Sequence, residues 1–261
     1  IQSDTQGRVT FNNDANYEVV WGSDHFKPDV FVLNEAAALP NQVVNIQNKI
    51  DLNGADRTVA TNSTRLCDQN QVRDAQGWMT TTGGRLTGDI QNSDVANPAG
   101  LIKIGPGVLQ LTATNTYDGG TTINEGTLQF TQAAAMPGAG VVTVNAGATL
   151  AISVGGWTDG PSANGTIAGL LNGLGGTAGG TVTLEPGSSL DLITTGTQTL
   201  ASPLSGGAPL GHAGPGTLIL SGNNTHTGGT ISKGGTLQLS SAGALGGVTG
   251  EKRRVVQPVQ R

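Results

Sequence analysis

Residues 101–130 read LIKIGPGVLQLTATNTYDGGTTINEGTLQF, and residues 210–239 read LGHAGPGTLILSGNNTHTGGTISKGGTLQL. The two segments align without a gap, Leu101 on Leu210, and fifteen of their thirty positions are identical. The identical residues are turn formers and apolar residues, with no His, Cys, Asp or Glu among them. The duplication therefore repeats an architecture and not a reactive site.

Apolar residues recur through this region as pairs two positions apart, which is the period of a strand with one buried face. The interval from Leu150 to Leu190 is about twice as long as the interval before it. We expect this long interval to contain two coils, with residues 167–171 supplying the missing strand. Residues 142–152 also match residues 182–192. The pairs are Leu109 and Leu111, Leu128 and Phe130, Leu150 and Ile152, Leu190 and Leu192, Leu218 and Leu220, and Leu237 and Leu239.

A period of about 20 residues lies in the range of leucine-rich repeats and of the larger β-solenoids. The leucine-rich framework L-x-x-L-x-L-x-x-N is absent from the sequence, and Thr, Gly and Asn dominate between the expected strands. The pattern therefore predicts an all-β fold, a parallel β-helix (β-solenoid) with roughly 20 residues per coil. At that period the chain would make about 11 or 12 coils and a rod about 55 Å long.

Glycines mark the expected corners of each coil. Gly-Pro-Gly and Gly-Gly occur at equal places in both copies, where a positive or fixed φ turns the chain. Asn115 and Asn224, which precede Gly-Gly, are expected to stack or to bond to the turn backbone. The second copy differs at one strand, where it reads Thr230-Ile231-Ser232 in place of Thr121-Thr122-Ile123. The apolar residue has moved by one place, so the sequence does not decide whether Ile231 points inward or outward.

Composition supports a solenoid and excludes several other classes. The chain has 261 residues, 42 glycines and a net charge of −5, whereas a nucleic-acid surface would need a basic stripe. The single cysteine, Cys67, excludes a disulfide framework and is expected to be a small buried hydrophobe. No apolar run approaches the length of a membrane helix, about 18 residues. The start at Ile1 is compatible with a processed or excised product.

The composition shifts near residue 100. Residues 1–100 contain 8 glycines and 19 charged residues, whereas residues 101–250 contain 34 glycines and 7 charged residues. We predict three parts: less regular, aromatic-containing coils and a cap (1–100), a regular Gly-rich β-helix (101–250) and a basic tail (251–261). The tail could be a cap, a connection to another domain or a strand offered to a neighbour.

Residues 1–100 still show short strand-like runs separated by turn residues. The expected strands are Val9–Phe11, Tyr17–Trp21, Asp29–Leu33, Val43–Ile46, Ile50–Leu52, Arg57–Ala60 and Arg85–Ile90. The one helical candidate, Glu35–Leu39, stops at Pro40 after barely a turn and is therefore expected to be a loop or cap. The aromatic residues could form a carbohydrate platform, but we expect them to close the end of the stacked core. These residues are Phe11, Tyr17, Trp21, Phe26 and Phe31.

The regular region offers few groups for chemistry. Its acidic residues are expected to be isolated, solvated charges, with only Lys103 and Lys233 as bases. His212 and His226 align with Lys103 and Tyr117 of the first copy and are expected to be ordinary substitutions, without a metal. We predict no catalytic, cofactor-binding or metal site and no cofactor. The acidic residues are Asp118, Glu125, Asp159, Glu185 and Asp191.

Two further patterns are expected to be structural. The threonines of the first copy resemble ice-binding faces, but threonine is also a common exposed strand residue. The glycines of residues 173–180 would form a phosphate loop only between a strand and a helix, and no helix is expected to follow them. The threonines are Thr112, Thr114, Thr116, Thr121 and Thr122.

The string G-P-G-x-L-x-L-x-x-x-N-T-x-x-G-G-T-x-x-x-x-G-T-L-Q, at residues 105–129 and 214–238, resembles the autotransporter-associated β-strand repeat, also called the passenger-associated transport repeat. The resemblance covers about a quarter of the chain. It implies a right-handed parallel β-helix in the secreted, surface-exposed passenger of a large bacterial protein. In that family the repeat is associated with export and folding of the stalk and does not define an enzyme.

We therefore expect an extracellular, non-catalytic structural or adhesive β-helix at the bacterial cell surface. One alternative is a filament subunit that assembles end to end through open coils and tails. A second alternative is a β-helix that binds or cleaves carbohydrate. The expected partners are copies of the chain itself, through the solenoid ends, or surface glycans, with no nucleic acid and no membrane span in this chain.

Overall fold

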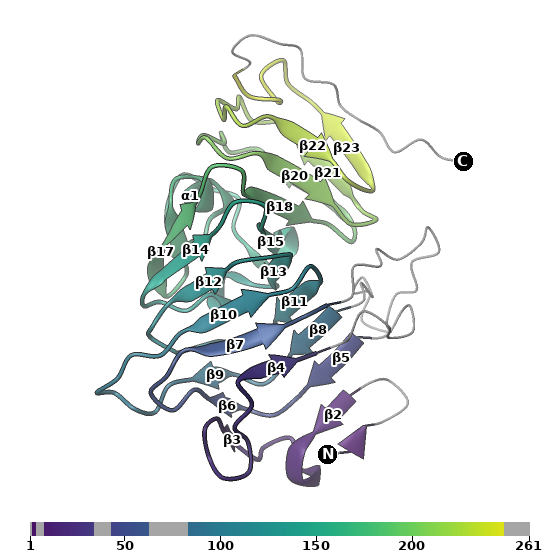
Figure 1. Ribbon diagram of the computed structural model, residues 1–261. Helices are drawn as coiled ribbons and strands as arrows, with labels where there is room; N and C mark the ends of the chain where they lie inside the picture. The colour runs from purple at the N-terminus through teal and green to yellow at the C-terminus, as the bar shows by residue number, and fades with distance from the viewer. Residues whose placement is uncertain (1, 4–7, 34–42, 63–82, 248–261) are drawn as a thin grey trace.

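A computed structural model describes residues 2–3, 8–33, 43–62 and 83–247. The described residues form a parallel β-helix whose coils follow one another from the N-terminal to the C-terminal end (Figure 1). One long sheet runs through the whole stack. Its strands, in spatial order, are β1 (Gln2–Ser3), β2 (Arg8–Thr10), β5 (Val43–Ile46), β8 (Gly83–Leu86), β11 (Val108–Leu111), β13 (Thr127–Phe130), β15 (Thr149–Ser153), β18 (Ser189–Ile193), β20 (Leu210–Ala213) and β22 (Thr230–Ser232).

Three shorter sheets form the other sides of the coils. The second sheet contains β4 (Val30–Val32), β7 (Arg57–Ala60), β10 (Leu101–Ile104), β12 (Thr121–Ile123), β14 (Val141–Val144), β17 (Gly179–Leu184) and β16 (Leu174–Gly176). The third contains β3 (Val19–Val20), β6 (Ile50–Asp51) and β9 (Ile90–Gln91), and the fourth β19 (Thr197–Leu200), β21 (Thr217–Leu220) and β23 (Thr236–Leu239). The helical pieces are η1 (Phe11–Asn13), η2 (Ala133–Ala135), η3 (Val154–Gly156) and α1 (Ile167–Leu171). No helix among the described residues is long and apolar enough to cross a membrane.

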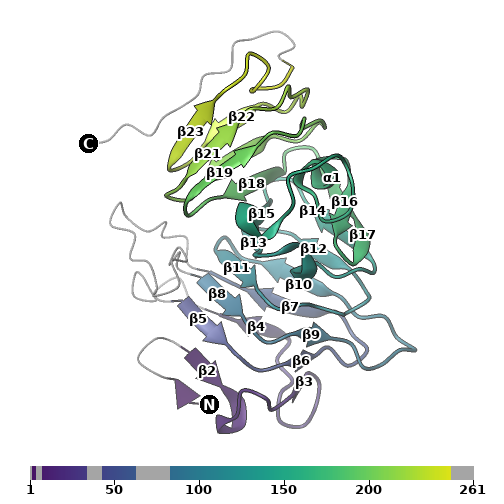
Figure 2. The same cartoon turned by 180° about the vertical axis from the view of Figure 1, so that it is seen from behind.

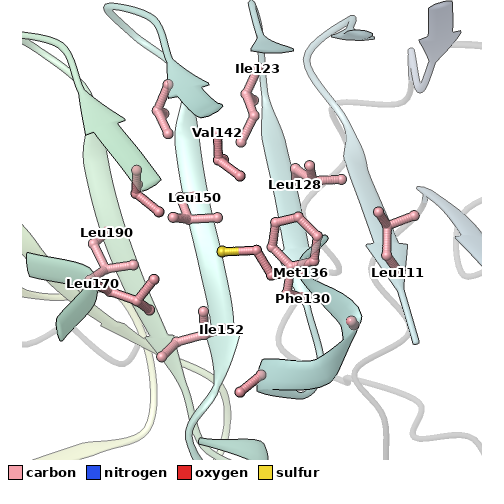
Figure 3. Close-up of a cluster of buried hydrophobic side chains, with 14 of the residues drawn as sticks. Leu111, Ile123, Leu128, Phe130, Met136, Val142, Leu150, Ile152, Leu170 and Leu190 are labelled. Atoms are coloured by element: carbon pink, nitrogen blue, oxygen red, sulfur yellow. The ribbon is translucent and has the colours of Figure 1, made fainter. Parts of the chain in front are cut away.

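Alternation along each strand builds the core. In the long sheet Leu128 pairs with Leu150, and Leu150 with Leu190, so side chains of the same parity stack inward from coil to coil. All three side chains belong to one cluster of buried residues (Figure 3). Five of the six apolar pairs predicted from the sequence are buried on the inner face of the solenoid. The sixth lies on the last described strand, where Leu237 is half-buried and Leu239 is exposed.

The strands predicted from residue 9 to residue 60 correspond to β2 to β7. The run predicted at residues 85–90 is divided between the end of β8 and the start of β9, which lie in different sheets. Near the start of the chain, four aromatic rings make edge-to-face contacts, with centroid distances of 5.0 to 5.8 Å. Trp21 is buried and the other three rings pack against the core, so these rings form no open platform. Tyr17 lies apart, 43% exposed. The four rings are those of Phe11, Trp21, Phe26 and Phe31.

Several predictions concern residues outside the described part of the chain. These are the loop Glu35–Leu39, the burial of Cys67 and the basic tail 251–261. The division of the chain near residue 100 also stays a prediction.

The long interval between Leu150 and Leu190 is one enlarged coil, and the prediction of two coils is wrong. Thr149 of β15 pairs directly with Ser189 of β18. The extra length is an excursion, residues 154–180, in which residues 167–171 form α1 and not a strand. All five residues of α1 are buried, and Thr166 caps the helix by accepting a hydrogen bond from Gly169 N at 2.9 Å.

The described residues accordingly form fewer coils than the sequence predicted for the chain. The long sheet has ten strands, of which β1 is antiparallel, leaving 10 − 1 = 9 parallel rungs. At the usual strand spacing, eight steps between nine rungs span about 40 Å. The first two coils also contain more residues than the predicted 20, because Arg8 pairs with Asn45 and Val43 pairs with Gly83.

The two copies of the repeat use different sides of the solenoid. In the first copy, β10 and β12 belong to the second sheet, and β11 and β13 to the long sheet. In the second copy, the equivalent strands β20 and β22 belong to the long sheet, and β21 and β23 form part of the fourth sheet (Figure 2). Equivalent strands of the second copy therefore lie one side further round the solenoid than those of the first copy. This change explains the wide spacing of the apolar pairs at Leu190 and Leu218, since Leu210 and not Leu218 stacks on Leu190.

The excursion provides a reason for this change. Its strand β16 pairs antiparallel with β17, with Leu174 opposite Thr181 and Gly176 opposite Gly179. This hairpin occupies the edge at which the next parallel strand of the second sheet would add. Leu170 of α1 meanwhile joins the core cluster (Figure 3). We infer that the hairpin ends the second sheet and that the chain continues from the long sheet.

Ile231 faces outward. Thr230 pairs with Leu210, so the backbone register of the repeat is kept. Thr230 and Ser232 are buried, whereas Ile231 is 41% exposed. The second copy therefore exposes an apolar side chain without any slip of the strand.

Two buried asparagines, Asn115 and Asn224, each form hydrogen bonds to the backbone of two neighbouring coils, an arrangement that we call an asparagine bracket. The sequence analysis expected such bonds to backbone groups as one of two possibilities. Asn115 accepts a hydrogen bond from Ile90 N at 2.9 Å and donates one to Ala135 O at 2.6 Å. Asn224 accepts from Leu204 N at 2.9 Å and donates to Ala244 O at 2.6 Å. In each copy one amide therefore joins the coil before to the coil after.

Replacing either asparagine should destabilise the solenoid. Asn224→Ala removes the partners of a buried N–H and a buried C=O, which we expect to cost about 2–4 kcal/mol. Asn224→Asp keeps the acceptor and loses the donor, so its stability should lie between those of the wild type and Asn224→Ala. The neighbouring exposed residue gives a matched control, because Asn223→Ala should change stability by less than about 0.5 kcal/mol. Chemical denaturation measures the differences, and equal stabilities of Asn224→Ala and Asn223→Ala would refute the bracket.

Candidate functional surfaces

The acidic residues of the regular region do not gather at one place. Glu125 accepts a hydrogen bond from Gly105 N at 3.1 Å, and Asp159 accepts from Ala201 N at 2.7 Å and Ser202 N at 3.1 Å. Asp118 accepts from Ala99 N at 3.1 Å, whereas Glu185 is exposed. Three of these carboxylates thus join segments distant in sequence, and the described residues hold no group of three or more potential metal ligands.

Asp191 is a buried residue, so the expectation that it is an isolated, solvated charge is wrong. Its carboxylate lies on the outer side of β18 and accepts hydrogen bonds from Lys233 Nζ at 2.7 and 2.8 Å. Gly211 lies between them, and a Cβ at this position would lie 2.1 Å from Asp191 Oδ1. Burial raises the pKa of Asp191, and Lys233 opposes this effect. The missing side chain of Gly211 therefore lets an ion pair reach across a whole coil.

Lys103 is unsuited to act as an exposed base. Its side chain is 0% exposed, and its Nζ donates hydrogen bonds to Ile104 O at 2.8 Å, Gly105 O at 2.6 Å and Glu125 O at 3.1 Å. Burial lowers its pKa to about 8, and Glu125 opposes this effect. The ammonium group holds the corner at Gly105, where φ is +76°.

His212 and His226 occupy the positions of Lys103 and Tyr117, as predicted from the alignment. Both are fully buried. His226 Nε2 lies 2.8 Å from Thr230 Oγ1, and in the first copy Tyr117 Oη lies 2.6 Å from Thr121 Oγ1. The two copies thus form an equivalent hydrogen bond to threonine, with a phenol in the first copy and an imidazole in the second. Thr121 is consequently buried, and its prediction as an exposed strand residue is wrong.

The glycines of residues 173–180 form the hairpin of β16 and β17. Gly173, Gly179 and Gly180 have positive φ values, and the helix α1 precedes them. Since no helix follows this segment within the described residues, its geometry differs from that of a phosphate loop, as the sequence predicted.

A loop that leads from β9 to β10 projects sideways from the solenoid (Figures 1 and 2). We call residues 92–98, which read NSDVANP, the side loop. Val95 in this loop is 88% exposed, and Ser93, Ala96, Asn97 and Pro98 are exposed as well. The loop interrupts the regular coils and lies outside both copies of the repeat.

Hydrogen bonds hold the side loop in one shape. Asn92 Nδ2 donates to Asp94 O, Asn97 O and Asp118 Oδ1, each at 2.9 Å. Its Oδ1 accepts a hydrogen bond from Gly54 N at 2.8 Å. A preordered loop with an apolar side chain is well suited to contact a partner, because little entropy is lost on binding. Sequence analysis missed this loop, although Asn and Asp at residues 92, 94 and 97 were the available signal.

Asp94 completes this arrangement. Its Oδ1 accepts from Ala96 N at 3.1 Å, and its Oδ2 accepts from Asn97 Nδ2 at 2.9 Å. The bond from Asn97 lowers the pKa of Asp94, and the bond from Ala96 acts in the same direction. The carboxylate therefore stays ionised at neutral pH and keeps both bonds.

Comparisons with known proteins identify the repeat. The family model of the passenger-associated-transport-repeat matches residues 101–130 and 213–239. The chain thus carries two such repeats, which are the two copies that occupy different sides of the solenoid. It is also 42% identical over 97 residues to a protein described as "Adhesin BmaC autotransporter" from Brucella suis biovar 1. That match covers 36% of this chain and 3% of the relative. No solved structure matches the chain.

The side loop should be separable from the stability of the coils. Val95→Ser changes an exposed residue and should alter the free energy of unfolding by less than about 0.5 kcal/mol. Asn92→Ala removes four hydrogen bonds of the loop and should speed amide exchange in residues 93–98 by about tenfold or more, since local opening then costs less. Hydrogen exchange measured by mass spectrometry checks both, and an unchanged exchange rate in Asn92→Ala would refute the proposed loop order.

Proposed function

We propose that this chain is a segment of a cell-surface adhesive protein of the autotransporter passenger type, and that it has no catalytic role. The observation that carries the proposal is the pair of passenger-associated transport repeats, together with the similarity to an autotransporter adhesin. The chain spans only 3% of that relative. The location at the bacterial surface and the adhesive role are therefore parts of the proposal.

The structure supports a mechanical role for the coils. Backbone bonds between parallel strands, the asparagine brackets and the Asp191–Lys233 ion pair all join one coil to others. A stack joined in this way resists bending and holds attached loops at fixed positions. Of the five carboxylates singled out in the regular region, four have structural partners. This use of acidic residues favours a stalk over an enzyme.

We propose the side loop as a contact element for adhesion. It supplies a strongly exposed apolar residue, Val95, on a backbone fixed by Asn92 and Asp94. Residues 93–98 lie outside both copies of the repeat, and Asn92 anchors the loop to Gly54 and to Asp118 of the first copy. Among the described residues, no comparable observation favours the filament alternative. The carbohydrate alternative loses its aromatic platform, because the rings near the start of the chain pack on one another.

Surface labelling and attachment assays test this function. An antibody raised against the folded chain should label intact cells of the source bacterium. Deleting the coding segment for residues 1–261 should reduce attachment to host cells or abiotic surfaces, and the wild-type segment should restore it. Lack of labelling on intact cells, or unchanged attachment after deletion, would contradict the proposal.

A pair of matched variants then tests the contact element. Complementation with Val95→Ser should restore attachment only partly, because the apolar contact is lost. Val141→Ser, which changes another exposed valine on β14, should restore it fully. Equal attachment by the two variants would remove the side loop from the proposal while leaving the adhesive role in place.

A further inference from the structure

Two buried histidines distinguish the second copy of the repeat from the first. His212 on β20 and His226 in the loop between β21 and β22 are each 0% exposed. Each has one ring nitrogen paired with a threonine: His212 Nε2 lies 2.8 Å from Thr194 Oγ1, and His226 Nε2 lies 2.8 Å from Thr230 Oγ1. Within the described part of the chain, the Nδ1 atoms of both rings lack a hydrogen-bond partner. Each site therefore provides a partner for one ring nitrogen and none for the other, so a second N–H donor would be buried unpaired.

Protonation would disturb both sites. An imidazolium has two N–H donors, and these sites provide an acceptor for one of them. The backbone of the next coil leaves little room for relaxation: an ideal Cβ on Gly235 would lie 3.2 Å from His212 Cε1, and one on Gly246 would lie 2.9 Å from His226 Nδ1. A charge at either ring would thus be buried without compensation unless the coil opened.

Within the described part of the chain, the neighbouring elements place no counter-charge on the inner face. The titratable side chains of residues 189–247 are Asp191, His212, His226 and Lys233. Asp191 and Lys233 pair with each other across Gly211 on the outer face of the long sheet, whereas His212 stacks between Leu192 and Ser232 on the inner face. The segments on either side of His226, residues 200–209 and 240–247, contain no titratable residue. Asp159 contacts residues 201 and 202 at an exposed position.

The first copy lacks this arrangement. Lys103 has three carbonyl acceptors for its ammonium group. Burial raises the pKa of Tyr117, while its bond to Thr121 opposes this effect, so the phenol stays neutral under acidic conditions. Acidification from pH 7.5 to 5.0 only completes the charge of Lys103, for which the acceptors are already in place, and leaves Tyr117 neutral. The first copy is therefore a control within the same molecule.

We propose that acidification below about pH 6 opens the C-terminal coils, residues 189–247, through protonation of His212 and His226, while the coils of residues 101–153 stay closed. This inference goes beyond the proposed adhesive function and does not depend on it. It makes the C-terminal part of the solenoid an acid-sensitive element next to an acid-stable one.

The direction of the effect follows from linkage. Burial lowers the pKa of both histidines below the ordinary value of 6.5, and for His226 the nearby backbone of Leu204 partly opposes the change. The unfolded chain then binds more protons than the folded chain as the pH falls through about 6.5. The stabilising contribution of the neutral histidines is therefore complete above that pH and is lost below it.

Hydrogen exchange of the full chain at pH 7.5 and pH 5.0 tests the proposal. After correction for the intrinsic effect of pH on exchange, opening of residues 189–247 should increase by about tenfold or more at pH 5.0, and opening of residues 101–153 should increase much less. Restoring pH 7.5 should reverse the change. An equal increase in both segments, or no increase, would overturn the proposal.

Variants assign the effect to the histidines. His226→Tyr installs the residue of the first copy and retains Thr230, so it should reduce the acid response, and adding His212→Gln should remove most of it. If the double variant does not fold, Asp191→Asn in the wild-type background tests whether the Asp191–Lys233 ion pair, the other buried charged site of this segment, is needed for the acid response. Acid opening that persists in Asp191→Asn supports the histidines. A response that disappears in Asp191→Asn, or persists in a folded double histidine variant, would overturn the proposal.

Discussion

Each coil of this molecule depends on its neighbours for the hydrogen bonds of its own backbone. The strands are short in every rung, and they pair in parallel with the coil before and the coil after. Polar side chains extend this dependence into the loops, where Asn115 and Asn224 each join two other coils. A coil of this kind has little stability alone, and cooperation between neighbours is the source of its rigidity.

The excursion of residues 154–180 shows how the strands of a repeat can move from one side of the solenoid to another. A parallel sheet can continue only while its edge is free, and the antiparallel strand β16 occupies the edge of the second sheet. The long sheet is unaffected and carries the winding onward through β18 and β20. One sequence motif thereby serves on two different sides of the same solenoid. The motif encodes four strands and the corners between them, while the preceding coil decides on which sides they lie.

Much of the fold could be predicted from the sequence, because the relevant signals are local. Apolar pairs such as Leu128 and Phe130 identify strands, and the duplicated Asn-Thr before Gly-Gly identifies a structural corner. Residues 167–171 were misassigned because five apolar residues fit a buried strand as well as a helical turn. The change of side was invisible in the motif itself, since both copies are locally alike. Its only sequence signal was the unusually wide spacing between Leu190 and Leu218.

The functional surfaces were harder to predict. Asp191 looked isolated because its partner, Lys233, is far away in the sequence, and because the importance of Gly211 appears only when the coils are stacked. The side loop lies outside the repeat, where periodicity gives no information. The histidines were correctly placed by alignment, but their burial without a partner for Nδ1 depends on the coils above and below.

Disulfide trapping tests the change of side most directly. In a Cys67→Ser background, Ile193→Cys and Ala213→Cys, which pair across β18 and β20, should form a disulfide on mild oxidation. If the second copy instead continued the winding of the first, Ser221 would lie opposite Ile193, because it follows Leu218 as Ile193 follows Leu190. The account predicts efficient cross-linking of the pair at 193 and 213 and none of the pair at 193 and 221. Cross-linking of 193 with 221, and not with 213, would contradict it.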